Sequence, residues 1–259
     1  MTTTDTDPYQ TEAAVYDVLW AGLNNLDLPF YLEVAEEYGG PLLELGCGTG
    51  RVLLPCLKAA GEAVGVDLSP SMVAAARARI AAEGAASVEV VEGDLRTVRL
   101  GRRFPLVIMA GQPLFHLPTD ADWLAALATV REHLAPGGRW VTGVPVPRFD
   151  AMARYSERHY FVGELRHPQT GQRIAMWDHN DYDLARQSIT RRRVTETLDE
   201  DGVVLKRQHS LNTNYYRYPG EVRKLIAEAG LRIEHEYGGY RRQPFGPAAE
   251  HFVWIATVD

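Results

Sequence analysis

The sequence predicts an α/β fold with a parallel sheet in the first 145 residues and an inserted antiparallel sheet after residue 150. Before residue 150, short apolar strands alternate with helical stretches, which is the pattern of parallel strand–helix–strand units. After residue 150, the segments alternate in polarity and are rich in Thr and aromatic residues, which favours antiparallel strands. With 46% hydrophobic residues among 259, the chain can form one substantial core with an elaboration.

Helix signals separate the expected parallel strands. Ser69 can cap a helix whose first turn contains Pro70, and Gly84 lies just beyond its end, so a helix is expected between Ser69 and Gly84. Thr119 followed by Asp122 is a carboxylate variant of the capping box and predicts the start of another helix. The five strands of this part are expected at residues 42–45, 63–66, 88–91, 106–109 and 140–144.

The second part of the chain adds antiparallel strands before the α/β core resumes. Asp201-Gly202 is a hairpin signal between two of these strands, and Gly230 predicts the end of a later helix. The antiparallel strands are expected around residues 173–183, 188–198 and 203–214, the helix at 219–229, and two last core strands at 231–237 and 251–258.

Charge balance and cysteine usage exclude several classes of function. Asp and Glu number 34 against 27 Lys and Arg, a net charge of −7, so duplex nucleic acid is not an expected partner. The run Arg191–Arg193, followed by acidic residues, is interpreted as part of a solvated strand. No stretch approaches the ~18 apolar residues of a membrane span, and the polar start has no signal-peptide features, so a cytoplasmic protein is expected. Cys47 and Cys56 lack metal-type partners, so no metal site is expected and both are interpreted as reduced thiols.

A glycine-rich loop follows the first strand. Gly46, Gly48 and Gly50 occupy relative positions 1, 3 and 5 between a hydrophobic strand and a helix. A nicotinamide dinucleotide fingerprint has glycines at positions 1, 3 and 6, so this loop has the wrong spacing for that cofactor. It still suits close approach of a ligand to the backbone. Cys47 within the loop is interpreted as a small packed residue, because no base is adjacent to it.

Two carboxylates follow at the ends of the next strands. Asp67, 17 residues after Gly50, can accept two hydrogen bonds from a ribose diol. Asp94 can accept a hydrogen bond from an exocyclic amine while Leu95 packs on an adenine face. Because parallel strands end at one edge of the sheet, these residues predict a site for an adenosine-containing ligand. Glu44 is open between supporting the loop and contacting the ligand.

Taken in order, these motifs resemble those of class I S-adenosylmethionine-dependent methyltransferases, strongly over residues 40–145 and weakly elsewhere. The resemblance implies a Rossmann-like, seven-stranded sheet with a reversed last strand, helices on both faces and an inserted antiparallel β-sheet lid. It also implies S-adenosylmethionine as the cofactor and S-adenosylhomocysteine as its product. The segments that carry the resemblance are Glu44–Gly50, Asp67, Gly93–Leu95 and Leu134–Gly138.

The resemblance further implies domain limits and the parts of a donor site. It assigns the loop glycines to the methionine half of the donor, Asp67 to the ribose hydroxyls and Asp94 to the adenine amine. Arg51 and Tyr16 are assigned to the methionine carboxylate. The expected domains are an N-terminal helical cap (1–40), the donor-binding α/β core (41–150), an antiparallel β lid and acceptor region (151–217) and the C-terminal completion of the core (218–259). The expected donor-binding residues are Tyr16, Glu44, Gly46, Cys47, Gly48, Gly50, Arg51, Asp67, Leu68, Met72, Asp94, Leu95, Met109 and Ala110.

The segment after the fourth strand bears on the acceptor. It is similar to the Asn-x-x-x-His-Leu stretch of glycine and amino-sugar N-methyltransferases, with Gln112 in place of Asn and His116 at the histidine. His116 is open between a general base, a donor contact and a buried histidine that precedes a helix. The segment lacks the Asn/Asp-Pro-Pro-aromatic pattern of nucleobase methyltransferases and the acidic group of magnesium-dependent catechol-type enzymes. Neither a nucleic acid nor a metal is therefore expected.

Aromatic and arginine side chains of the later segments are expected to line the acceptor site. Aromatic rings suit a cationic amine or a flat apolar acceptor, although they occur as often in a sheet core. Arg148 and Arg217 can hold a carboxylate or phosphate, or can belong to surface ion pairs. The expected acceptor-binding residues are Gln112, His116, Arg148, Trp177, His179, Tyr216, Arg217 and Tyr240.

The expected function is transfer of a methyl group to a small molecule, with an amine nitrogen slightly favoured as the acceptor. Such a transfer is an in-line displacement, so the protein has to align the reacting atoms and exclude water. The alternatives are O- or C-methylation, a noncatalytic adenosyl-binding protein on the same fold, and a nicotinamide-dependent oxidoreductase. A homodimer is left open.

Overall fold

The computed structural model describes Tyr9, Ala13, Tyr16 and residues 26–156, 158–167 and 170–258. It divides the chain into two compact units. The larger unit comprises residues 24–146 and 217–259, and the smaller comprises residues 1–23 and 147–216. Most of the N-terminal helical cap expected over residues 1–40 lies outside the described residues, and helix α2 (Leu28–Tyr38) is the part that is described.

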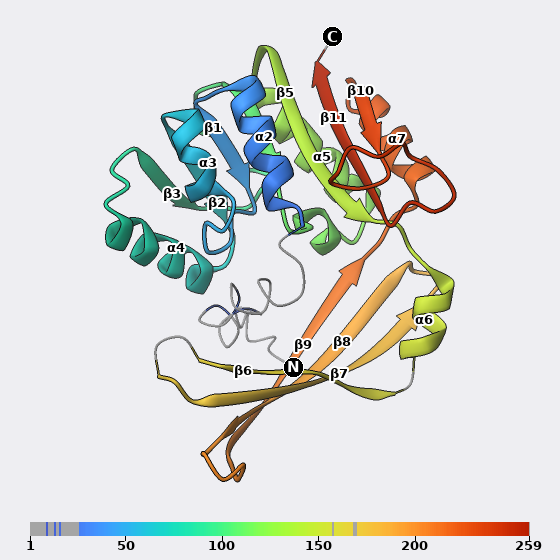
Figure 1. Ribbon diagram of the computed structural model, residues 1–259. Coiled ribbons are helices and arrows are strands. Elements are labelled where there is room, and N and C mark those ends of the chain that lie inside the picture. The colour runs from blue at the N-terminus through green and yellow to red at the C-terminus, as the bar shows by residue number, and fades with distance from the viewer. Residues whose placement is uncertain are drawn as a thin grey trace. The chain divides into compact units, whose positions relative to one another are not determined.

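A seven-stranded sheet forms the centre of the larger unit (Figure 1). Its strand order is β10-β11-β5-β4-β1-β2-β3, and the pairs among the first five strands of the chain are parallel. Only β11 runs against its neighbours β5 and β10, so the seven-stranded sheet with a reversed last strand is confirmed. The strands are β1 (Leu42–Leu45), β2 (Ala63–Asp67), β3 (Val88–Glu92), β4 (Phe104–Met109), β5 (Leu134–Pro145), β10 (Leu231–Tyr237) and β11 (His251–Val258).

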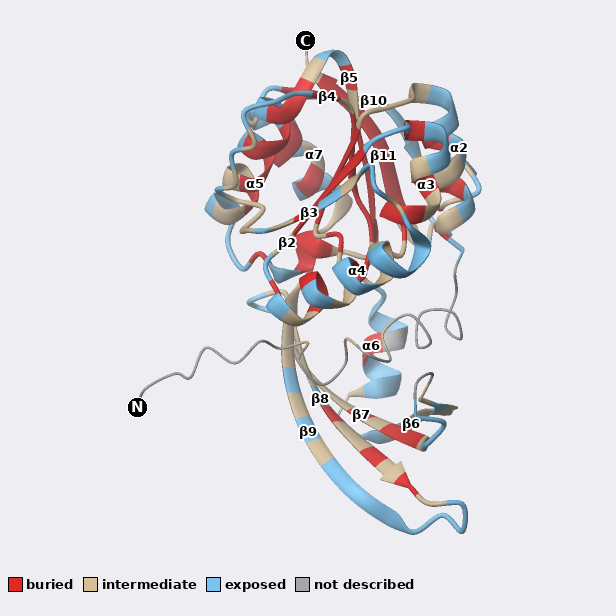
Figure 2. Cartoon of the chain, turned by 90° about the vertical axis from the view of Figure 1, so that its left-hand side faces the viewer, coloured by how far each residue is buried: buried red, intermediate tan, exposed pale blue. Residues whose placement is uncertain are grey.

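Helices cover both faces of this sheet, with α2 and α3 on one face and α5 and α7 on the other (Figure 2). The expected caps are present. Ser69 Oγ accepts a hydrogen bond from Met72 N, and Gly84 closes the helix in the left-handed conformation. Thr119 and Asp122 form the expected capping box. The remaining elements of this unit are α3 (Leu53–Ala60), α4 (Pro70–Glu83), the 3-10 helix η1 (Pro113–His116), α5 (Asp120–His133) and α7 (Pro219–Glu228).

The core lies where the central strands are covered on both faces, drawn in red in Figure 2. All four residues of β1 are buried, which explains its nearly continuous apolar sequence. Trp140 of β5 and Trp254 of β11 pack edge to face at 5.5 Å between ring centroids and are fully buried. Glu44 is the one charged residue within β1 and lies in this apolar environment.

The smaller unit contains a four-stranded antiparallel sheet in the order β6-β7-β8-β9. Three of its strands were expected, and Gly202 occupies the predicted hairpin turn with φ +86°. Strand β6 was not predicted, because a bulge between Phe161 and Gly163 interrupts its alternation. The elements are α6 (Phe149–Tyr155), β6 (His159–Arg166), β7 (Arg173–Asp183), β8 (Ser188–Leu198) and β9 (Val204–Tyr215).

One expectation for this sheet is wrong. The run of three arginines was interpreted as solvated, yet Arg193 is only 6% exposed. Its guanidinium donates hydrogen bonds from Nε and Nη2 to the two carboxylate oxygens of Asp178, at 2.7 and 2.8 Å. Arg192 points to the opposite face and is exposed, because successive side chains of a strand alternate between faces.

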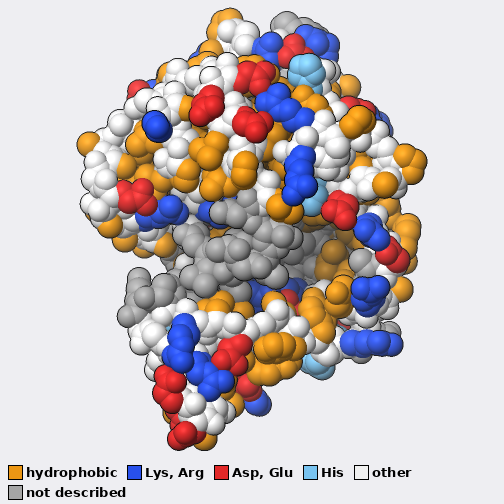
Figure 3. Space-filling model, in the orientation of Figure 1, with side chains coloured by type: hydrophobic (Ala, Val, Ile, Leu, Met, Phe, Trp, Pro, Cys, Tyr) orange, Lys and Arg blue, Asp and Glu red, His pale blue; other side chains and the backbone are white. Residues whose placement is uncertain are grey.

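On the face drawn in Figure 3, acidic and basic side chains are interspersed over the larger unit. Within the described part of the chain, no helix is long and apolar enough to span a membrane.

Candidate functional site

The glycine loop between β1 and α3 requires glycine. Gly46, Gly48 and Gly50 have φ angles of +77°, +53° and +79°, in the left-handed region that other residues adopt at a cost. A Cβ atom on Gly46 would lie 2.5 Å from Cβ of Pro113, so the loop packs directly against η1. A Cβ atom on Gly48 would meet no atom within 4 Å, which leaves the backbone there accessible to a ligand.

Asp67, the last residue of β2, connects this loop to the next helix. Its Oδ2 accepts a hydrogen bond from Gly48 N at 2.7 Å, and its Oδ1 accepts one from Ser69 N at 2.9 Å. These two hydrogen bonds hold the carboxylate between the glycine loop and the start of α4. Of the neighbouring residues expected at the site, Leu68 is exposed and Met72 is buried in α4. The structure therefore places the loop and Asp67 together.

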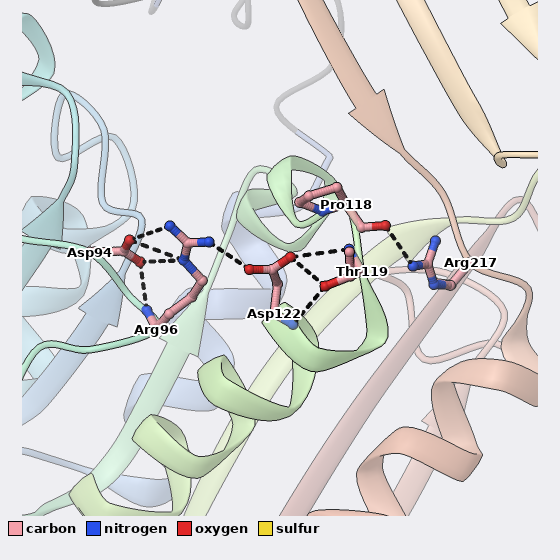
Figure 4. Close-up of polar contacts among 6 residues, drawn as sticks. All are labelled: Asp94, Arg96, Pro118, Thr119, Asp122 and Arg217. Carbon is pink, nitrogen blue, oxygen red and sulfur yellow. Dashed lines mark hydrogen bonds and ion pairs between the residues drawn. The ribbon is translucent and has the colours of Figure 1, made fainter. Parts of the chain in front are cut away.

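Asp94 follows β3 and is held by Arg96 (Figure 4). Its Oδ1 accepts a hydrogen bond from Arg96 N at 2.8 Å, and its Oδ2 accepts one from Arg96 Nη2 at 2.7 Å. These hydrogen bonds with the Arg96 side chain hold the pKa of Asp94 below its usual value. The adjacent Leu95 is half-buried. Sequence reasoning did not identify Arg96, because nothing in the local pattern indicates which way its side chain turns.

Glu44 is buried beneath the glycine loop with one oxygen, Oε2, lacking a hydrogen-bond partner among the described residues. Burial raises the pKa of its carboxyl group to about 8, although the nearby charge of Arg51 opposes the shift. The Cys47 thiol is also buried, and burial raises its pKa well above the usual value. Cys47 is therefore a packed, uncharged residue, as the sequence indicated.

The raised pKa of Glu44 predicts a pH dependence of stability. The folded protein keeps the Glu44 proton up to about pH 8, whereas the unfolded carboxyl loses it near its usual value of 4.5. Stability should therefore fall as pH rises from 4.5 to about 8, and stay level above it. In Glu44→Gln this fall should shrink by an amount on the order of 5 kcal/mol, measured by urea unfolding across that pH range. The control is Glu89→Gln, at an exposed carboxyl on β3. Matching pH profiles for the wild type and Glu44→Gln would contradict the assignment.

Arg51, directly after the loop, is paired with Asp27 just before α2. Two guanidinium nitrogens donate to the two carboxylate oxygens at 2.8 and 2.7 Å, and both side chains are largely buried. Sequence reasoning missed Asp27, since a lone acid 24 residues away carries no pattern. Tyr16, the other residue expected near the methionine carboxylate, belongs to the smaller unit, where its ring contacts Tyr9 at 6.1 Å.

The chain after β4 has an unusual backbone conformation. The Met109 carbonyl accepts a hydrogen bond from Thr142 Oγ1 at 2.6 Å, and Ala110 is buried. Gln112 then adopts φ +71° and ψ +38° at the start of η1, and His116 is exposed at its end. A residue other than glycine pays about 1–2 kcal/mol in this left-handed conformation, and Asn tolerates it better than most. The backbone conformation at position 112 thus favours Asn, the residue in the similar N-methyltransferase stretch. Gln112 keeps a side-chain amide there, but its backbone is strained.

Tyr240, from the segment between β10 and β11, lies against α2. Its ring is 6.0 Å from the ring of Tyr31, and its hydroxyl donates to the Gly143 carbonyl at 3.4 Å. Burial raises the pKa of both phenols. Tyr31 also donates to the Met109 carbonyl at 3.5 Å, so these two tyrosines link three segments beside the end of β4.

Arg217, expected to hold an acceptor anion, is buried and directed at the chain after η1. Its Nη2 donates to the Pro118 carbonyl at 3.1 Å (Figure 4), and its Nε donates to Asp120 Oδ1 at 3.2 Å. Arg217 therefore anchors the segment that follows His116, through Pro118 and Asp120.

Several expected acceptor residues belong to the smaller unit. Trp177 and His179 lie on one face of β7, where their rings contact Phe161 at 5.4 Å and His159 at 4.8 Å. Tyr216 is buried, and Arg148 forms an exposed ion pair with Asp150.

The opposite face of β7 carries a polar cluster that sequence reasoning missed. The Asn180 amide nitrogen donates to the hydroxyls of Tyr160 and Tyr182 at 3.0 and 3.3 Å. Because successive side chains of a strand point to opposite faces, the sequence alone could have placed Asn180 and Tyr182 on the face opposite His179. That alternation is the signal that could have identified the cluster.

The chain is similar in sequence to known methyltransferases. Residues 42–138 match the family model described as a methyltransferase domain. The chain is 26% identical over 233 residues to a dTDP-3-amino-3,4,6-trideoxy-alpha-D-glucopyranose N,N-dimethyltransferase of Streptomyces venezuelae, covering 88% of this chain and 92% of that protein.

Solved methyltransferase structures are similar to this chain over nearly its whole length. The CcbJ methyltransferase of Streptomyces caelestis matches with a TM-score of 0.79 and 25% identity, covering 98% of each chain. A S-adenosylmethionine-dependent methyltransferase of Clostridium acetobutylicum has a TM-score of 0.80 at 16% identity, covering 96% of this chain and 98% of that one, and this likeness concerns the fold.

The residues present fit an adenosyl sulfonium ligand. The accessible backbone at Gly48 suits close ligand approach, Asp67 presents a carboxylate for hydroxyl groups, and Glu44 Oε2 is a buried acceptor without a partner among the described residues. A buried acceptor of this kind suits a positively charged group such as an ammonium, whose charge would favour the ionised carboxylate and so oppose the effect of burial on the pKa of Glu44.

Proposed function

We propose, from the premise that this chain is a class I S-adenosylmethionine-dependent methyltransferase, that it methylates an amine nitrogen of a small molecule. The observation that carries the choice of nitrogen is the Streptomyces venezuelae relative, which aligns over 88% of the chain and is named for N,N-dimethylation of an amino sugar. The stretch from Gln112 to His116, similar to that of amino-sugar N-methyltransferases, supports the same choice.

In this proposal the donor lies along the carboxyl edge of the sheet. Gly46, Gly48 and Gly50 face its methionine half, and Glu44 Oε2 accepts a hydrogen bond from its ammonium group. Asp67, held beside the glycine loop by hydrogen bonds from Gly48 N and Ser69 N, binds the ribose hydroxyls through its carboxylate. Arg51 holds the methionine carboxylate and would have to share its guanidinium with Asp27.

Bound S-adenosylmethionine would supply a methyl group on a sulfonium, and the amine nitrogen would lose a proton as it takes up that group. His116 is the proposed recipient of the proton, because its exposed imidazole lies at the end of η1 and an imidazole nitrogen can act as a general base. Gln112 orients the acceptor from the same short helix. Arg217, through its bond to the Pro118 carbonyl, holds this segment in place.

The acceptor region in this proposal is the antiparallel sheet of residues 151–217. Its rings include Trp177 and His179 on one face of β7 and Tyr160 and Tyr182 around Asn180 on the other. Such aromatic surfaces suit a compact cationic amine before it is deprotonated. The free thiols Cys47 and Cys56 suit the reducing cytoplasm as the place of action.

The test is a paired acceptor assay with the purified chain and S-adenosylmethionine. One acceptor is an amino sugar nucleotide, and the other is the same compound with a hydroxyl in place of the amine. We expect methylated product, detected by mass spectrometry, from the amine alone. Product from the hydroxyl compound alone would contradict nitrogen methylation. Donor binding without turnover of amines, phenols or carbon nucleophiles would point to a noncatalytic adenosyl-binding protein.

His116→Ala should lower kcat by about 100-fold or more and leave the Kd of S-adenosylhomocysteine unchanged, because the variant loses a proton acceptor. The matched control is His235→Ala, which removes an exposed histidine from β10. Equal kcat values for the wild type and His116→Ala at saturating substrates would remove His116 from the catalytic residues.

A further inference from the structure

We propose that Arg96 is a positioning residue for the nucleobase: it fixes Asp94 so that the site accepts an amino group and rejects a carbonyl group at that edge of the base. The inference rests on the donor site proposed above and adds a residue to which neither the comparisons nor the sequence motifs assign a role.

The contacts of Asp94 define its orientation (Figure 4). Three N–H groups of Arg96 reach its carboxylate: the backbone N at 2.8 Å from Oδ1, Nη2 at 2.7 Å from Oδ2, and Nε shared between both oxygens at 3.1 and 3.0 Å. The Asp94 carbonyl also accepts hydrogen bonds from Thr97 N and Val98 N, which hold its backbone in a turn. Side chain and backbone of Asp94 are therefore both held in place.

Arg96 is itself held from the opposite side. Its remaining terminal nitrogen, Nη1, donates to Asp122 Oδ1 at 2.6 Å, and Asp122 is fixed by its capping box with Thr119. The Arg96 carbonyl accepts a hydrogen bond from Thr129 Oγ1 at 3.0 Å. Arg96 thus connects the end of β3 to the first turn of α5, and its planar guanidinium is held between two carboxylates.

This arrangement leaves Asp94 suited to one kind of partner. A carboxylate has about four acceptor positions, and the four hydrogen bonds from Arg96 reach two at each oxygen. The two longest, at 3.1 and 3.0 Å, share the single Nε–H, so an N–H of an incoming base would take the position that this shared donor gives up. The guanidinium also keeps the pKa of Asp94 low, so the carboxyl group carries no proton that it could donate to a carbonyl oxygen. The amino group of a 6-amino purine can donate a hydrogen bond to the Asp94 carboxylate. The oxygen of a 6-oxo purine is itself a hydrogen-bond acceptor, so it cannot bond to this carboxylate.

Arg99 offers a matched control from the same segment. It connects the chain after β3 to α5, through Nη1 to Thr129 Oγ1 at 3.0 Å and Nε to Glu132 at 2.7 Å. Among the described residues, Arg99 makes no hydrogen bond or ion pair with Asp94, so Arg99→Gln weakens the connection to α5 and leaves the carboxylate held by Arg96.

The experiment is calorimetric titration of the wild type, Arg96→Gln and Arg99→Gln with S-adenosylhomocysteine and with its 6-oxo analogue S-inosylhomocysteine. We expect the wild type to prefer the adenosyl ligand by about 100-fold, because a site built for an N–H rejects a ligand that lacks it. In Arg96→Gln the preference should fall to about 10-fold or less, mainly through weaker adenosyl binding. Arg99→Gln should keep the wild-type ratio. If Arg96→Gln does not fold, Arg96→Lys replaces it; this variant keeps the charge, loses the fork and should also show a reduced ratio.

A preference for the adenosyl ligand in Arg96→Gln equal to that of the wild type would overturn the inference. An equal loss of preference in Arg99→Gln would also overturn it, because Arg96 would then act only by connecting β3 to α5. Asp94→Asn provides an independent check, since its amide can donate to a 6-oxo group and should shift the preference toward the inosyl ligand. A wild type that binds S-adenosylhomocysteine without any preference would overturn the nucleobase reading alone. A wild type that binds neither ligand would overturn the donor site as well.

Discussion

Asp67→Ala is expected to weaken S-adenosylhomocysteine binding by about 1–3 kcal/mol, roughly 5- to 150-fold. The ribose hydroxyls lose a charged partner, and the glycine loop loses the hydrogen bond from Gly48 N to Asp67 Oδ2. The hydrogen bond from Ser69 N at the start of α4 is lost as well. Because the same carboxylate contacts both the ligand and the glycine loop, the loss of binding free energy should lie in the upper part of that range.

The matched control is Glu89→Ala. Glu89 is an exposed carboxylate of the neighbouring strand β3 that pairs in register with Val64, before the carboxyl edge of the sheet. It should leave the Kd within about twofold of the wild type, as expected for an exposed group away from the ligand. Unchanged affinity in a folded Asp67→Ala protein, shown by matching circular dichroism, would refute the ribose assignment.

Gly46→Ala is expected to abolish measurable donor binding and to destabilise the fold by about 2–4 kcal/mol. The added Cβ would lie 2.5 Å from Cβ of Pro113, on a residue whose φ is already +77°. Either the glycine loop or η1 must move. Movement of η1 would displace Gln112 and His116 together with Pro113.

Gly61→Ala isolates the steric part of this effect. Gly61 has nearly the same φ, +71°, but a Cβ there meets no atom within 4 Å. It should cost about 1 kcal/mol through backbone strain alone and leave donor binding intact. Equal unfolding free energies and equal donor affinities for the two variants would show that the contact between Gly46 and Pro113 has no role.

The position of the proposed donor residues at one edge of the sheet was predictable from the sequence. Gly46 follows β1, Asp67 ends β2 and Asp94 lies just after β3, and parallel strands bring their carboxyl ends to one edge. Capping at Ser69 and Thr119 was equally predictable, since the signal lies within one helical turn.

The ion pairs between residues far apart in the sequence were not predicted. Arg51 meets Asp27, and Arg96 meets Asp122, which lies 26 residues further along the chain. Local sequence carries no information on which charged side chains will meet, so these pairs emerge only when helices pack on the sheet. The buried state of Arg193 was missed for the same reason, because its partner Asp178 is on the neighbouring strand.

The acceptor residues were the least predictable. Strand alternation separates Trp177 and His179 from Asn180 and Tyr182, so an aromatic-rich segment divides its rings between two faces. Composition alone cannot assign one face to a ligand, whereas the register of β7 with its neighbours gives each face a definite set of side chains.

The most direct test of the central claim is calorimetric titration of the purified wild-type chain, stripped of any carried-over ligand, with S-adenosylmethionine, S-adenosylhomocysteine and NADPH. A donor site built from the glycine loop, Asp67 and Asp94 predicts binding of the two sulfur ligands with Kd values on the order of micromolar and no heat of binding with NADPH. Binding of NADPH without either sulfur ligand would contradict it.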